Sequence, residues 1–120
     1  MKKGNIEYIA IPYTSVDKKV RKFRINVSDY FYAKLMAEGH IVYAPISHNG
    51  RVAEKYKLPK EWKFWKRIDS EFLRVSKKLW VVRLDGWKTS IGVQEEIRIA
   101  KKLKIPIEYL DYESESEKNI

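Results

Sequence analysis

The chain of 120 residues contains no cysteine and only two histidines, His40 and His48. The first absence excludes disulfide bonds, thiolate catalysis and cysteine-based zinc sites, and two histidines are too few for a histidine-rich metal site. No apolar run approaches the roughly 20 residues that a membrane-spanning helix needs. The first residues include two lysines without an apolar segment behind them, so no secretory signal is expected. These absences predict a cytoplasmic protein without a metal or a membrane partner.

Glycine is also scarce, with five residues in the whole chain. Gly86 and Gly92 do not have the spacing of a dinucleotide-binding fingerprint, so no nicotinamide cofactor is expected, and no other cofactor is predicted.

Charge, by contrast, is abundant: 34% of the residues are charged and the formal net charge is +9. The lysines and arginines are spread along the chain, mostly on the expected polar faces of helices. A solvated basic surface is the first interpretation, and attraction of anionic ligands, from nucleotides to polynucleotides, is the second. Residues 111–120 are mostly acidic and polar and predict a disordered tail behind one domain at residues 1–110.

Apolar runs alternate with helical spacings along the domain. Strands are expected at residues 7–12, 41–44, 79–84 and 105–110. Helices are expected from a cap at Ser15 to about residue 38, from about residue 60 through residue 73, and from a cap at Ser90 to about residue 104. Residues 46–59 are polar and predict a long binding loop or lid.

This alternation predicts an α/β fold: a flavodoxin- or Rossmann-like, doubly wound parallel sheet of about four to five strands with helices on both faces. Right-handed crossovers make 2-1-3-4 the simplest strand order. Such sheets bind ligands beyond the carboxyl ends of their strands, where the winding reverses. The expected crevice therefore lies between residues 12–14 and residues 85–90.

Two acidic residues fall on expected apolar helix faces. At 100° per residue, Glu96 shares a face with Val93 and Ile97, whereas Glu95 lies on the polar side. Asp69 falls among the aromatic residues of the second helix. An ionised carboxylate without partners costs several kcal/mol to bury, so each acid is either satisfied by a local partner or held for function. The nearby helix N-terminus would favour the ionised form of Glu96. Two carboxylates beside one crevice are suited to cleaving a glycosidic bond.

The stretch S-I-G-V-Q-E-E-I-R-I-A at residues 90–100 resembles the S-x-G-V-x-x-E-x-x-x-A signature of the nucleoside 2-deoxyribosyltransferase superfamily. That superfamily includes the 2-deoxynucleoside 5-phosphate N-glycosidases and small uncharacterised relatives. Residues 8–14, 39–45 and 65–73 resemble, in the same order, its first strand and substrate loop, its second strand, and its segment with the active-site aspartate. The resemblance covers about residues 7–110.

This resemblance implies that Glu96 is the nucleophile that attacks the anomeric carbon of a 2-deoxyribosyl group, with Asp69 orienting or assisting it. It further implies that four other residues bind the substrate: Tyr13, Thr14, Ser90 and Gly92. The loop after the first strand reads P-Y-T-S, without the glycine and arginine that grip a phosphate in the glycosidase branch. Homodimers are common among the relatives, so a homodimer is a further expectation.

Two residues beside the expected crevice are additional substrate-binding candidates. His48 follows the second strand and is equally well explained as a surface residue. Trp87 lies in the loop before Ser90, where it would stack on a base or cover the site.

The sequence thus predicts an N-glycosidase or deoxyribosyltransferase acting on a (deoxy)nucleoside or nucleotide. Two alternatives stay open: a non-catalytic nucleotide-binding module of the same fold, and a basic protein that binds nucleic acid.

Overall fold

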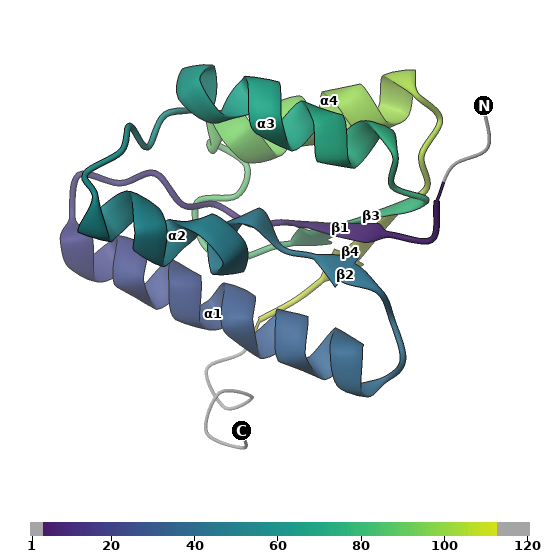
Figure 1. Cartoon of the computed structure of the whole chain (residues 1–120), viewed down its shortest axis with the longest axis horizontal. Coiled ribbons are helices and arrows are strands. Elements are labelled where there is room, and N and C mark those ends of the chain that lie inside the picture. Colours follow the sequence, from purple (N-terminus) through teal and green to yellow (C-terminus); the bar gives the residue numbers. More distant parts are fainter. Residues whose placement is uncertain (1–3, 113–120) are drawn as a thin grey trace.

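A single parallel sheet forms the centre of the protein, as seen in the computed structural model, which describes residues 4–112 (Figure 1). Its four strands are β1 (Glu7–Ala10), β2 (Val42–Tyr43), β3 (Lys78–Val82) and β4 (Ile107–Leu110), in the order β2-β1-β3-β4. All three strand pairs are parallel. The predicted fold class and the strand order 2-1-3-4 are confirmed.

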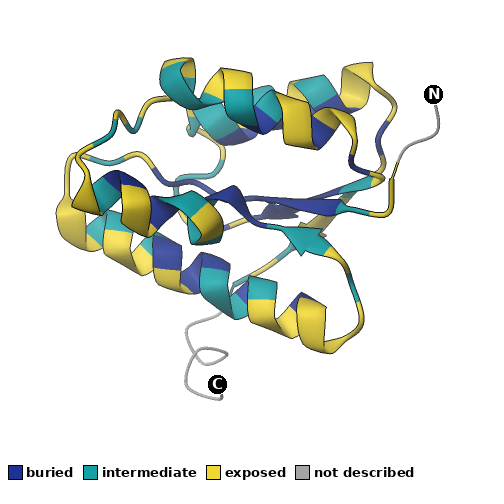
Figure 2. Cartoon of the chain, in the orientation of Figure 1, coloured by how far each residue is buried: buried dark blue, intermediate teal, exposed yellow. Residues whose placement is uncertain are grey.

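Helices cover both faces of this sheet. On one face lie α1 (Lys18–Ala37) and α2 (Pro45–Lys55), and on the other lie α3 (Trp62–Arg74) and α4 (Ile91–Lys102) (Figure 1). The central strands β1 and β3 are largely buried, whereas β2 and β4 at the sheet edges are more accessible and the outer helix faces are exposed (Figure 2). This is the doubly wound arrangement, and it leaves the carboxyl end of β1 open between the two helix layers.

Alternation along the strands builds two separate cores. Tyr8 and Ala10 of β1 pack toward α3 and α4, whereas Ile9 and the following Ile11 pack toward α1. Successive side chains of a strand point to opposite faces, so each strand contributes to both cores. Tyr8 is fully buried, and its side chain lies on the same side of the sheet as α4.

The helix caps differ in how well the sequence predicts them. Ser90 caps α4 as predicted, since its Oγ accepts a hydrogen bond from the backbone N–H of Val93 at 3.2 Å. The expected cap of α1 at Ser15 is wrong, because Asp17 is the capping residue and accepts from the N–H of Lys19 at 2.8 Å. Ser15 instead accepts from the N–H of Asp17. Either side chain can cap a helix.

The loop expected at residues 46–59 is mostly wrong, because Pro45–Lys55 is helix α2. Pro45 sits in the first turn, where a missing N–H costs nothing. Gly50 allows α2 to approach α1 closely: a Cβ there would lie 2.9 Å from Ile25 Cγ1. The Ser28 and Ser47 hydroxyls also bond across the two helices at 2.7 Å. Packing against α1 stabilises a segment whose own residues are weak helix formers.

Packed structure continues slightly past residue 110. Asp111 forms an ion pair with Arg83 at 2.7 Å, and the Tyr112 ring lies 6.3 Å from the ring of Phe31. The rest of the expected acidic tail, residues 113–120, lies outside the described residues. Within residues 4–112, no helix is both long and apolar enough to cross a membrane.

Candidate functional site

A cavity of about 300 Å³ opens beyond the carboxyl end of β1. The segment after β1, helix α2, the first half of α3 and the N-terminus of α4 surround it. Both segments that the topology predicted at the crevice line this cavity. Residues 12–14 contribute Tyr13 and Thr14, and residues 85–90 contribute Gly86, Thr89 and Ser90. Gly92 lines the same cavity. A volume of this size suits a small organic ligand such as a nucleoside.

The two acidic residues predicted on apolar faces are both buried and both line this cavity. Glu96 of α4 is 5% exposed and Asp69 of α3 is 6% exposed. Their neighbour Glu95 is more exposed and pairs with Arg98 at 2.9 Å. The helical geometry therefore separated the adjacent glutamates correctly.

Asp69 has no local partner that would explain its burial. Its Oδ1 atom is buried without a hydrogen-bond partner, and the residue takes part in no ion pair within the described part of the chain. Burial raises the pKa of its carboxyl group from 3.8 to about 7, because the charged form loses its hydration. A buried polar atom left without a partner calls for an explanation, and a bound ligand would supply one.

Glu96 receives a hydrogen bond from the Tyr8 hydroxyl, which donates to its Oε2 atom. Burial raises the pKa of Glu96 well above its ordinary value, the nearby Asp69 charge raises it further, and the Tyr8 hydrogen bond opposes this rise. The α4 N-terminus was expected to favour the ionised form of Glu96, and loss of hydration acts in the opposite direction. Two interacting carboxyl groups of this kind titrate as a pair.

Tyr8 is a site residue that the sequence reasoning missed. It lies on β1, 88 positions before Glu96 in the chain. Burial also raises the pKa of its phenol group, as does the adjacent Glu96 charge. The available signal was its place in a strand expected to be buried, since a buried tyrosine hydroxyl needs a polar partner.

Two tryptophans of α3 line the cavity beside Asp69. Trp62 and Trp65 are half-buried, and the Trp65 indole N–H donates to the Pro59 carbonyl at 2.8 Å. Their place on the same helix face as Asp69 was already visible in the sequence. A flat base or sugar ring can pack against such rings.

Arg24 of α1 supplies a positive charge to the cavity wall. Its guanidinium donates to the backbone carbonyls of Thr14 at 2.9 Å and Asp85 at 3.3 Å, so it bridges the loops that follow β1 and β3. Its partial burial lowers its pKa. Gly86, with φ of 93°, leaves room for it, since a Cβ there would lie 2.7 Å from Arg24 Nη2.

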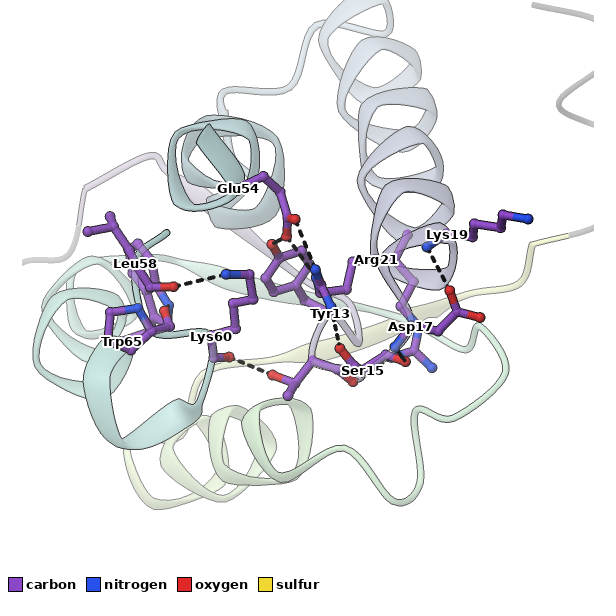
Figure 3. A network of polar contacts seen from close by, with 12 residues as sticks. Tyr13, Ser15, Asp17, Lys19, Arg21, Glu54, Leu58, Lys60 and Trp65 are labelled. Atoms are coloured by element: carbon purple, nitrogen blue, oxygen red, sulfur yellow. Dashed lines mark hydrogen bonds and ion pairs between the residues drawn. The ribbon is translucent and has the colours of Figure 1, made fainter. Parts of the chain in front are cut away.

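A polar network holds the rim of the cavity in place (Figure 3). The Tyr13 hydroxyl donates to Glu54 of α2, which also accepts from Arg21 Nε at 2.9 Å. The Thr14 hydroxyl donates to the Lys60 carbonyl at 2.6 Å, in the connection between α2 and α3. The loop after β1 is thus bonded to both neighbouring segments, which holds it at the rim of the cavity.

Two predicted substrate contacts lie outside the cavity lining. His48 is exposed on α2, where its Nδ1 bonds the Ala44 carbonyl at 2.7 Å and its ring packs against Tyr43. Trp87 packs against the core on the α4 side of the sheet, with its ring 5.9 Å from that of Tyr109. The turn at Gly86 directs Trp87 toward β4, while the backbone before it faces the cavity.

Among residues 4–112, no group of three or more histidine, aspartate or glutamate side chains is arranged to hold a metal ion. Carboxyl, phenol, guanidinium and indole groups line the cavity.

A family model described as "Domain of unknown function (DUF1937)" matches residues 5–111, which is nearly the whole domain. No curated protein matches the chain.

Proposed function

We propose that this chain, which belongs to the DUF1937 family, is an N-glycosidase or deoxyribosyltransferase acting on the N-glycosidic bond of a (deoxy)nucleoside or nucleotide. The observation that carries the proposal is the pair of buried carboxyl groups, Glu96 and Asp69, on the wall of a nucleoside-sized cavity. Neither has a cationic partner in an ion pair among the described residues. The resemblance of residues 90–100 to the nucleoside 2-deoxyribosyltransferase signature supports the same assignment.

In the proposed reaction, a Glu96 carboxylate oxygen forms a bond to the anomeric carbon while the bond from that carbon to the base nitrogen breaks. The electron pair of the broken bond leaves with the base, which takes a proton from water, and Asp69 orients or assists Glu96. Water in a hydrolase, or a second base in a transferase, then attacks the same carbon and frees Glu96.

The surroundings of the pair suit this chemistry. The transition state carries positive charge on the sugar ring, and a buried carboxylate stabilises such charge strongly because little water screens it. The Tyr8 hydroxyl stabilises the ionised form of Glu96. Trp62 and Trp65 offer surfaces for the base, and Arg24 with the α4 N-terminus would attract a phosphate. A cytoplasmic location, which gives access to nucleotides, belongs to this proposal.

A non-catalytic nucleotide-binding module is the second candidate. The observation that favours it is the raised pKa of Glu96, because a protonated carboxyl group is a poor nucleophile. In that case the cavity would bind the nucleotide and leave its glycosidic bond intact.

Incubation with deoxynucleosides, ribonucleosides and their 5′-monophosphates, followed by chromatography for free base, tests the proposal. We expect base release that falls by at least about a thousandfold in Glu96→Gln, since the nucleophile is lost. Glu95→Gln is the matched control, because it changes the neighbouring glutamate on the solvent side, and its release should stay near that of the unsubstituted protein.

Release that persists in Glu96→Gln would overturn the glutamate mechanism. Tight nucleotide binding without any release would favour the binding module instead.

A further inference from the structure

A second hollow continues outward from the cavity. It has a volume of about 640 Å³ and shares Glu61, Trp62 and the residues 89–91 with the cavity. From there it extends between the first turns of α3 and α4, where Lys63 and Lys66 line it. Trp62 borders both spaces. A ligand that fills the cavity can therefore extend onto the outer surface of α3 and α4.

This outer surface is rich in cations. The two helices pack side by side over one face of the sheet (Figure 1), and their outer sides are exposed (Figure 2). We call the outer sides of α3 and α4, together with the residues that end α4, the α3–α4 face. Its exposed cations are Lys63, Lys66, Arg67, Arg74, Arg98, Lys101, Lys102 and Lys104.

Few acids balance these cations. Glu71 and Glu95 are the acids within the two helices that are not buried, and each pairs with an arginine of its own helix. The other two acids, Asp69 and Glu96, point into the cavity. Glu61 precedes α3 at the rim of the cavity. The lysines of this face form no ion pairs within residues 4–112, so an excess of positive charge faces solvent next to the site.

We infer that the hollow and the α3–α4 face bind a single-stranded polynucleotide, one nucleotide of which enters the cavity. The inference rests on the proposed function and narrows its substrate to a nucleotide within a strand. Phosphates along the strand match the unpaired lysines. Trp62 and Ile91 offer apolar contact for the base that neighbours the nucleotide in the cavity. Ile91 has 71% of its surface exposed.

A single strand fits this geometry better than a duplex. The two carboxyl groups are 5% and 6% exposed, so a base stacked within a helix does not reach them. A mononucleotide bound in the cavity would leave the outer hollow empty, whereas a strand occupies both spaces.

Fluorescence anisotropy measures the affinity of the protein for labelled 12-nucleotide strands and so tests the inference. The ligands are single-stranded DNA, RNA of the same sequence, and duplex DNA, each at several salt concentrations. The test variant carries Lys63→Glu, Lys66→Glu and Lys101→Glu. The control carries Lys18→Glu, Lys19→Glu and Lys22→Glu. These three lysines are exposed on α1. Both variants change the net charge by the same amount, so both lose the same non-specific electrostatic attraction for the oligonucleotide. A difference between them therefore reports on the position of the charges.

We expect the α3–α4 variant to bind a single strand at least about tenfold more weakly at 0.1 M salt, and its slope of log affinity against log salt to be smaller by about 2. The α1 variant should weaken binding by less than about threefold. Equal weakening in both variants, no binding by the unsubstituted protein, or tighter binding of the duplex would overturn the inference. Urea unfolding of both variants checks that they remain folded.

Base release separates this inference from the proposed function. We expect the α3–α4 variant to lose release from an oligonucleotide more strongly than release from a mononucleotide, and an equal loss would overturn the inference. If the unsubstituted protein releases base from no substrate, the proposed function fails, and the comparison of the two variants in binding still decides whether the α3–α4 face binds a strand.

Discussion

Replacing Asp69 with asparagine tests the electrostatics of the site without knowledge of the substrate. The Asp69 carboxyl group is 6% exposed, and burial raises its pKa from 3.8 to about 7. Asparagine has nearly the shape of the protonated acid and carries no charge at any pH. The variant therefore removes the titration while preserving the volume of the side chain.

The expected effect depends on pH. Below about pH 3 the carboxyl group is protonated in both the folded and the unfolded chain, so the variant should have nearly the stability of the original. Between pH 4 and about 7 the unfolded chain ionises first, because its pKa is lower, and the free energy of unfolding falls as the pH rises. A shift of about three pH units corresponds to about 4 kcal/mol, which is the upper limit of the gain for Asp69→Asn at pH 8.

Urea unfolding at pH 4 and pH 8, followed by circular dichroism, measures this gain. With a urea dependence of about 1.5 kcal/mol per molar, the midpoint of Asp69→Asn should rise by up to about 2.7 M at pH 8 and by only a few tenths of a molar at pH 4. Glu95→Gln is the control, since it removes one acid from an exposed ion pair with Arg98 and should be slightly destabilising at pH 8. Equal differences at the two pH values, or a loss of stability in Asp69→Asn at pH 8, would refute the argument from burial.

Three further predictions concern the residues around the pair. Base release should rise with pH only above the range in which a glutamate carboxyl group ordinarily ionises, because the raised pKa of Glu96 delays formation of its carboxylate; a rise complete by pH 5 would contradict this. Tyr8→Phe should move that rise to still higher pH, since the hydrogen bond that lowers the pKa of Glu96 is lost, and should cost about 1 kcal/mol of stability in urea. Gly86→Ala should be more destabilising than Gly39→Ala, by about 1 kcal/mol or more, although both positions have positive φ. A Cβ at Gly86 meets Arg24, whereas one at Gly39 meets nothing within 4 Å, so equal losses would show that Arg24 is not held as described.

Periodicity in the sequence was sufficient to predict the architecture. The apolar run at Glu7–Ala10 and the one at Lys78–Val82 are local signals of buried strands, and the helices between them fix the right-handed crossovers. The inward direction of Glu96 and Asp69 also followed from the sequence, because the angle between two side chains on one helix depends only on their separation.

Other features depended on contacts between distant segments. Helix α2 has weak local signals of helix formation. Its close approach to α1 depends on the contact between Gly50 and Ile25, which lie far apart in the sequence. Trp87 and His48 lie in segments next to the cavity, yet backbone direction turns both side chains away from it.

The protonation of the site was likewise decided by the tertiary structure. The sequence determined that two acids and a helix N-terminus come together, and the N-terminus alone would favour ionised Glu96. The folded chain adds Tyr8 from a strand 88 positions away and removes most of the water around both carboxyl groups. The pKa of an acid reflects every dipole, charge and water molecule around it, and most of those neighbours are brought there by segments remote in sequence.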